Sequence, residues 1–128
     1  MLDTKPSPEM ANQLFMTAAG LASQAATQWL AKAVEAGPKY AVKDGSRTIG
    51  QLLDLCGNAN VRFRKKNSKW YNAFKKAGLV RHTDSGCVDI PWAHYYRQEY
   101  GLQMAAADAA VEFLRKHGVD VYNWNYID

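Results

Sequence analysis

Residues 55–83 read LCGNANVRFRKKNSKWYNAFKKAGLVRHT and contain eight of the chain's sixteen Lys and Arg residues but neither Asp nor Glu. The rest of the chain has eight basic against twelve acidic residues, so this basic segment alone produces the net charge of +4. Like charges repel one another, and a small domain tolerates such a cluster more readily when a polyanion is the intended neighbour. The segment therefore points first to nucleic acid as the partner.

Length and composition predict one globular domain. The 128 residues, 48% hydrophobic and 22% charged, suffice for a single core. We expect this domain to span residues 1–128, with residues 1–6 disordered. Polar residues interrupt the most apolar stretch, residues 14–36, and residues 1–6 lack the order of a signal peptide. We therefore expect a cytoplasmic protein, of a bacterium or an infected host cell, with no membrane partner.

The chain before the basic segment predicts a long helix and a short strand. Ser7 and Pro8 have the types of an N-cap and a first-turn residue, and Gly37 is typical of a helix end. Alanine and larger apolar residues recur at helical spacing between them. Residues 39–43 then alternate and run into a turn at residues 44–46, which predicts a short strand.

A second, shorter helix is expected next. Thr48 and Gln51 have the spacing of a capping box, in which each side chain satisfies a backbone donor of the first turn. Apolar residues follow, and Gly57 supplies an end.

After a turn at residues 58–60, the basic segment is expected to form a helix as far as Ala77, where Gly78 ends it. Asn67 and Ser68 favour caps over helix interiors. The segment is therefore either one helix with a flaw or two pieces, the second capped by Ser68.

Turn chemistry predicts a small hairpin over residues 79–90. Its turn would lie at residues 84–86, and Pro91 would end its second arm. Two more helices are expected over residues 93–101 and 102–118, each ending at a glycine.

Residues 48–90, taken together, resemble a winged helix-turn-helix, whose second helix commonly closes with Ala-Gly-Leu-Val and a basic strand, as residues 77–81 do here. In that family the second helix enters the major groove of DNA, and the hairpin, or wing, touches the backbone or the minor groove. The resemblance implies a DNA-facing surface made of Asn60, Arg62, Arg64, Lys65 and Lys69, with Arg81 and His82 at the start of the wing.

Helical geometry sorts the side chains of the basic segment into two groups. Those near one apolar stripe are expected to pack in the core, namely Phe63, Trp70, Phe74 and Ala77. Those away from it are Arg62, Lys65, Lys66, Lys69 and Lys76. Tyr71 lies off the stripe beside the lysines, where its ring can stack on a base. A solvated helix face usually mixes charge signs, whereas this one has no acid, which favours phosphate binding.

Residues 119–127 alternate, which predicts an extended tail with Tyr122, Trp124 and Tyr126 on one side. Such aromatic side chains can stack successive bases of a single strand. Equally, the tail can be an edge strand that packs on the core beside Tyr40 and Val42. Both interpretations remain open at this point.

Catalytic patterns are weak in this sequence. His82, His94 and His117 are not spaced as metal ligands, and Cys56 and Cys87 do not form a Cys-x-x-Cys pair. We expect no catalytic residue, no metal, no cofactor and no enzymatic activity.

The sequence thus predicts a mainly α (α+β) fold, with a winged-helix-like centre and a small β-hairpin. The expected function is that of a non-enzymatic DNA-binding protein, a small phage or bacterial transcription or replication regulator that binds through a basic helix and wing. The first alternative is a sequence-tolerant single-stranded DNA-binding protein, and the second is an inhibitor of an acidic host protein. Alanine-rich faces on the first and last helices predict a homo-oligomer, with the C-terminal helical segment as an oligomerisation element.

Overall fold

A computed structural model of the chain describes residues 5–83, 88–90 and 97–128. The elements, in chain order, are α1 (Pro8–Ala36), β1 (Tyr40–Asp44), β2 (Arg47–Leu52), β3 (Gly57–Phe63), α2 (Lys69–Lys76), β4 (Arg81–His82), β5 (Val88–Ile90), α3 (Tyr100–Lys116) and β6 (Val121–Ile127). The predicted mainly α (α+β) fold class is confirmed, with more residues in helices than in strands.

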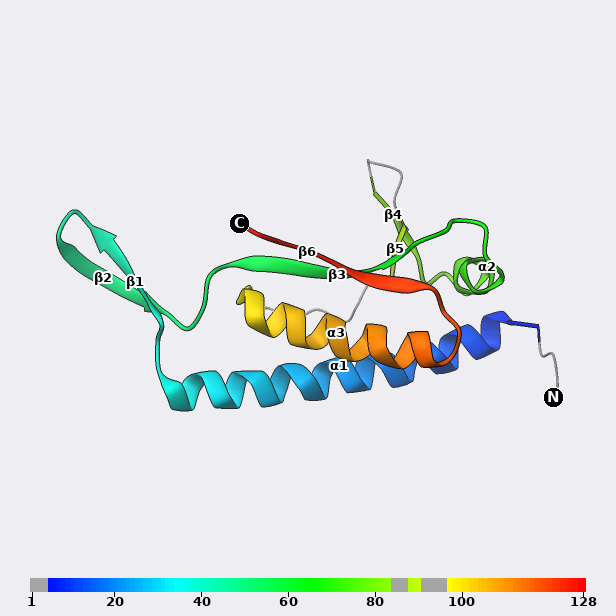
Figure 1. The fold of residues 1–128 in the computed structure, drawn as a ribbon, viewed down its shortest axis with the longest axis horizontal. Coiled ribbons are helices and arrows are strands. Elements are labelled where there is room, and N and C mark those ends of the chain that lie inside the picture. The colour runs from blue at the N-terminus through cyan, green and yellow to red at the C-terminus, as the bar shows by residue number, and fades with distance from the viewer. Residues whose placement is uncertain (1–4, 84–87, 91–96) are drawn as a thin grey trace.

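The strands form two antiparallel sheets. One has four strands in the order β4-β5-β3-β6, and the other is the β1–β2 hairpin. Figure 1 shows β3 and β6 lying over α3, with α3 over α1, while the β1–β2 hairpin projects from one end of the molecule. Both long helices therefore lie on the same side of the four-stranded sheet.

Helix α1 follows the predicted boundaries closely. The Ser7 hydroxyl accepts a hydrogen bond from the Met10 backbone N–H at 3.2 Å, and Gly37 ends the helix with a φ of 87°. Only small side chains of α1 are fully buried, namely Ala11, Ala18, Ala22 and Ala26. Because α3 also buries alanines, at Ala106, Ala107 and Ala110, the two helices can pack closely.

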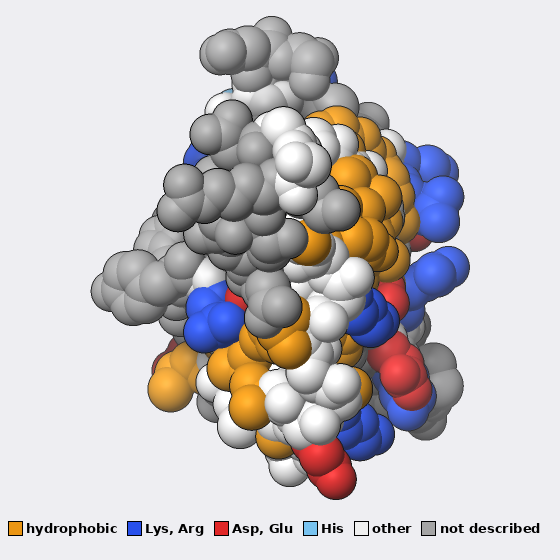
Figure 2. All heavy atoms as spheres, turned by 90° about the vertical axis from the view of Figure 1, so that its left-hand side faces the viewer, with side chains coloured by type: hydrophobic (Ala, Val, Ile, Leu, Met, Phe, Trp, Pro, Cys, Tyr) orange, Lys and Arg blue, Asp and Glu red, His pale blue; other side chains and the backbone are white. Residues whose placement is uncertain are grey.

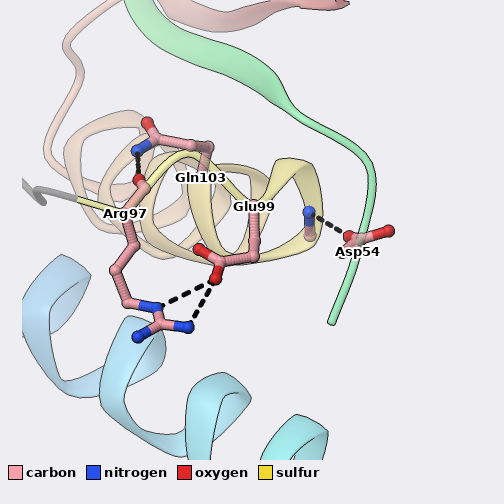
Figure 3. Close-up of polar contacts among 5 residues, drawn as sticks. Asp54, Arg97, Glu99 and Gln103 are labelled. Atoms are coloured by element: carbon pink, nitrogen blue, oxygen red, sulfur yellow. Dashed lines mark hydrogen bonds and ion pairs between the residues drawn. The ribbon is translucent and has the colours of Figure 1, made fainter. Parts of the chain in front are cut away.

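The start of α3 is held by the segment between β2 and β3 (Figure 3). Glu99 precedes the helix without a side-chain cap, and the Asp54 carboxylate instead accepts a hydrogen bond from the Gly101 N–H at 2.7 Å. A carboxylate is favourable there because the N-terminus of a helix carries partial positive charge. Arg97 pairs with Glu99 at 2.6 Å beside this cap. These contacts fix where β3 begins relative to α3.

The prediction that a helix ends at Gly101 is wrong, because α3 begins at Tyr100 and runs through this glycine. A Cβ atom at Gly101 would lie 2.6 Å from the Trp29 ring. The position therefore serves close packing between α1 and α3.

We expect Gly101→Ala to lower the free energy of unfolding by about 1–3 kcal/mol, because the added methyl overpacks this contact. Gly20→Ala is the matched control: it also lies in a helix, but a Cβ there meets nothing within 4 Å. The control should be stabilised by up to about 1 kcal/mol through helix propensity. Urea unfolding of both variants measures the difference, and equal stabilities would contradict the packing.

The predicted helix over residues 48–57 is also wrong, because Arg47–Leu52 is strand β2. Gly45, with a φ of 64°, and Ser46 form the two-residue turn of a hairpin in which β2 pairs with β1. A Gly-Ser pair between two extended runs is a hairpin signal, because glycine adopts the positive φ that such a two-residue turn requires. Pairing with β1 therefore overrides the local capping-box pattern.

The basic segment does not form one helix either. Its first part is strand β3, where Ala59, Val61 and Phe63 alternate on the buried face. Its second part is the short helix α2, whose N-cap Ser68 accepts a hydrogen bond from the Tyr71 N–H at 3.1 Å. Of the alternative of two pieces, the second helix capped by Ser68 is confirmed, but the first piece is a strand, and the predicted turn at residues 58–60 lies within that strand.

The predicted hairpin over residues 79–90 is present as the paired strands β4 and β5. Its turn at residues 84–86 lies outside the described residues, as do Pro91 and residues 93–96 of the next predicted helix. Most of residues 1–6, expected to be disordered, also lie outside them.

Candidate nucleic-acid interface

The two faces of the four-stranded sheet differ in chemistry. On the first face, Val61 and Val121 are fully buried against the helices. Asn123 lies on this face too, and its amide donates to Asp108 of α3 at 2.7 Å. Residues paired across neighbouring strands share a face, and successive residues alternate between faces. The even-numbered residues of β3 and β6 therefore lie on the second face.

Three cross-strand pairs build this second face. In the antiparallel register of β3 and β6, Asn58 pairs with Tyr126, Asn60 with Trp124 and Arg62 with Tyr122. We call these six residues the aromatic face. Every described helix places its buried residues in the core on the other side of the sheet. Of the tail aromatics, Tyr126 is 41% exposed, and Tyr122 and Trp124 are half-buried.

Arginines lie over the aromatic rings of this face. The Arg62 guanidinium carbon is 4.2 Å from the centroid of the Trp124 ring, and that of Arg64 is 5.2 Å from the Tyr122 ring. Both distances are within the range of a cation–π interaction. The Trp124 and Tyr126 rings meet edge to face with centroids 5.0 Å apart. The rings are thus held in fixed orientations before any ligand binds.

Exposed lysines lie beyond one end of the aromatic face. The chain leaves β3 at Phe63 and continues through Arg64, whose N–H donates to the Asp120 carbonyl at 3.1 Å. We call the exposed cations of this loop and of α2 the basic end, namely Arg64, Lys65, Lys66, Lys69, Lys75 and Lys76. Among them Arg64 also pairs with the Asp120 carboxylate at 3.3 Å, with both side chains about half exposed. Such a pair is weak in water, so the cation remains able to meet a phosphate.

Two residues predicted to be exposed are buried. Arg62 is only 6% exposed, because β3 places it between neighbouring strands with its guanidinium over Trp124. Tyr71 is 5% exposed, packs edge to face on Phe63 and has its hydroxyl 3.0 Å from Nε2 of His82. The prediction that Tyr71 lies outside the core, ready to stack on a base, is therefore wrong.

The other predicted site residues separate into two groups. Asn60 lies on the aromatic face, whereas Lys65, Lys66, Lys69 and Lys76 belong to the basic end. Arg81 and His82 are exposed on β4, at the opposite edge of the sheet from β6. The core assignments of Phe63 and Phe74 are confirmed, and Trp70 and Ala77 pack against the same core while partly exposed.

Asn58 also belongs to the candidate site, although the sequence alone did not identify it. Its amide donates to the Tyr126 hydroxyl at 3.4 Å, so it belongs with the tail aromatics. The signal was available, because residues 58–63 alternate polar and apolar as residues 122–126 alternate aromatic and polar. The tail is an edge strand as one interpretation held, but its partner is β3 rather than Tyr40 and Val42.

Other kinds of site find no support in the described part of the chain. No group of three or more His, Cys, Asp or Glu side chains there is arranged to hold a metal ion. None of the helices there is long and apolar enough to span a bilayer. Comparison of the chain with protein-family models, with curated proteins and with solved structures found no match.

Proposed function

We propose that this protein binds single-stranded DNA along the aromatic face, without strong sequence preference. The observation that carries the proposal is the row Tyr122, Trp124 and Tyr126, which lies on a sheet face that no described helix covers. Base stacking on such side chains contributes about 1–3 kcal/mol per base and tolerates any base, since every base has a π face.

The aromatic face and the basic end would contact different parts of the DNA strand. Bases stack against the tail rings, while the amides of Asn58 and Asn60 offer donors and acceptors to base edges. Phosphates continue to the basic end, where lysines replace their counterions. Arg62 supports the Trp124 ring from within the sheet rather than meeting phosphate itself.

Single strands suit this face better than duplex DNA. Bases within a duplex are stacked on one another and cannot lie on aromatic side chains unless they are first unstacked. The prediction of duplex binding through a basic helix now rests on α2 alone, whose eight residues span only about 12 Å. Duplex binding, a role in transcription or replication, inhibition of an acidic host protein and the absence of enzymatic activity remain predictions.

A salt series on single-stranded and duplex oligonucleotides of matched sequence tests the proposal. We expect tighter binding to the single strand at every salt concentration, and similar affinity for oligonucleotides of different sequence. A preference for duplex with sequence dependence would favour the winged-helix interpretation instead. No binding to either at low salt would refute both.

Replacing Lys65 and Lys69 together with alanine should weaken single-strand binding at low salt. Each lost phosphate contact is expected to reduce the magnitude of the slope of log affinity against log salt by about 0.7. The slope of the double variant should therefore be shallower than that of the parent by about 1.4. The matched control removes the exposed Lys32 and Lys39, which lie outside the basic end and change the net charge equally. If both double variants lose the same slope, only overall charge matters and the basic end is not the phosphate site.

A further inference from the structure

Strand β6 forms one outer edge of the four-stranded sheet. The Asp128 N–H donates to the Cys56 carbonyl at 3.0 Å, and the Asp120 carbonyl accepts from Arg64. In an antiparallel pair, alternate residues direct both backbone groups to the partner, so the even-numbered residues of β6 face β3. The backbone groups of Asn123, Asn125 and Ile127 therefore point away from the sheet, where no described strand lies beyond them.

The residues of this edge carry none of the features that usually protect an edge strand from pairing with another strand. Natural edge strands commonly carry charges, proline or a bulge, whereas residues 121–127 read VYNWNYI and contain none of the charged residues or proline. The register of β6 with β3 runs without a shift from Val121 to Ile127. Ile127 is 53% exposed. Figure 2, which views the end of the molecule bearing the hairpin, shows hydrophobic side chains gathered at the surface there.

We propose that β6 pairs antiparallel with β6 of a second copy of this chain, about a two-fold axis through Asn125. In this register Asn125 faces its own counterpart, and Asn123 faces Ile127 of the other copy. The outward-directed backbone N–H and C=O groups of all three residues then form hydrogen bonds with those of the other copy. The remaining odd residue, Val121, already donates its N–H to the Val119 carbonyl at 3.0 Å.

Side chains and charge favour a second copy over an unrelated strand. The register sets Trp124 opposite Tyr126 of the other copy, twice, and aromatic cross-strand pairs are stabilising. It also sets Asp128 opposite Tyr122, whose ring lies beneath the Arg64 guanidinium. The five donors of Arg64 allow it to meet this second carboxylate while keeping Asp120. The Asp128 carboxylate of each copy thus pairs with the Arg64 guanidinium of the other copy.

The axis would stand perpendicular to the sheet, so both copies present the same face to the same side. The two four-stranded sheets would become one, with the helices beneath and two aromatic faces joined above. This interface differs from the helix faces that the sequence indicated. The proposed dimer rests on the edge of β6 alone and does not depend on the proposed DNA binding.

Sedimentation equilibrium of the full chain without nucleic acid tests the proposal. We expect a monomer–dimer equilibrium, with the amides of Asn123, Asn125 and Ile127 exchanging more slowly with solvent as protein concentration rises. A monomer at all concentrations would overturn the proposal, including one whose β6 instead binds an extended peptide. A dimer in which these three amides stay unprotected would overturn it too.

Ile127→Lys should raise the dimer dissociation constant by about tenfold or more, because a lysine on an edge opposes strand pairing. Ile127→Pro removes an outward N–H without touching the bonds to β3 and should have a similar effect. Val34→Lys is the matched control, since Val34 is 61% exposed on α1. Circular dichroism checks that each variant folds. If all three variants dimerise as the parent does, the interface lies elsewhere.

Discussion

Trp124→Ala should weaken binding of single-stranded DNA by about 1–3 kcal/mol, or about 5- to 150-fold in dissociation constant, because one stacking platform is removed. The Trp124 ring is the central member of the row and is oriented by Arg62 at 4.2 Å and by Tyr126 at 5.0 Å. Trp124→Phe, which keeps an aromatic face, should retain part of the affinity. Fluorescence anisotropy with a labelled oligonucleotide measures all three proteins.

Loss of a half-buried tryptophan also costs stability, so a second pair of variants separates binding from folding. Tyr126→Ala and Tyr40→Ala remove the same ring at nearly the same exposure, 41% and 39%. Tyr126 belongs to the aromatic face, whereas Tyr40 lies at the base of the β1–β2 hairpin. Only Tyr126→Ala should weaken binding. Equal effects would contradict the assignment of the site.

Phe74→Ala should lower the free energy of unfolding by about 3–5 kcal/mol, the cost of emptying a large aromatic site in a core. Phe74 is fully buried, and its ring packs edge to face on Phe63 and Trp70 at centroid distances of 5.6 and 6.2 Å. Guanidinium unfolding followed by circular dichroism gives the value.

Asn72→Ala is the control for this substitution, because Asn72 is exposed on the same helix and should change stability by less than about 0.5 kcal/mol. A small effect of Phe74→Ala would mean that α2 is a loosely attached surface element. The basic segment would then supply charge without contributing to the core.

Elements with strong local signals were predicted correctly from the sequence. The cap at Ser7 and the glycine at Gly37 delimit α1, and the alternation of residues 121–127 identifies β6. Ser68 similarly gave the start of α2 as one of two alternatives. In each case the local pattern and the tertiary environment favour the same structure.

The errors fall where pairing between distant residues decides the structure. Thr48 and Gln51 have the spacing of a capping box, but their segment pairs with β1. Residues 61–63 were assigned to a basic helix, but they belong to β3, which lies between β5 and β6, and Arg62 is buried as a result. A count of charges cannot reveal such burial, because it depends on partners 27 or more residues away, as in the pairing of Arg62 with Asp89 and Tyr122.

The candidate site was predicted in parts rather than as a whole. The tail aromatics and Asn60 were singled out on separate grounds, but only the register of β3 with β6 brings them onto one face. Tyr71 was assigned to the site from helical geometry over a range in which residues 61–63 are strand and the helix begins only at Lys69, so its direction was wrong. Correct strand assignment for residues 57–63 would have corrected both points.

Mapping of amide chemical-shift changes by NMR during titration with a single-stranded oligonucleotide tests the central proposal most directly. The account predicts that the largest changes fall on β3 and β6, at Asn58, Asn60 and residues 122–126, and extend to Lys65 and Lys66. Changes confined to α2 and β4, or no change on β6 at saturation, would contradict binding on the aromatic face.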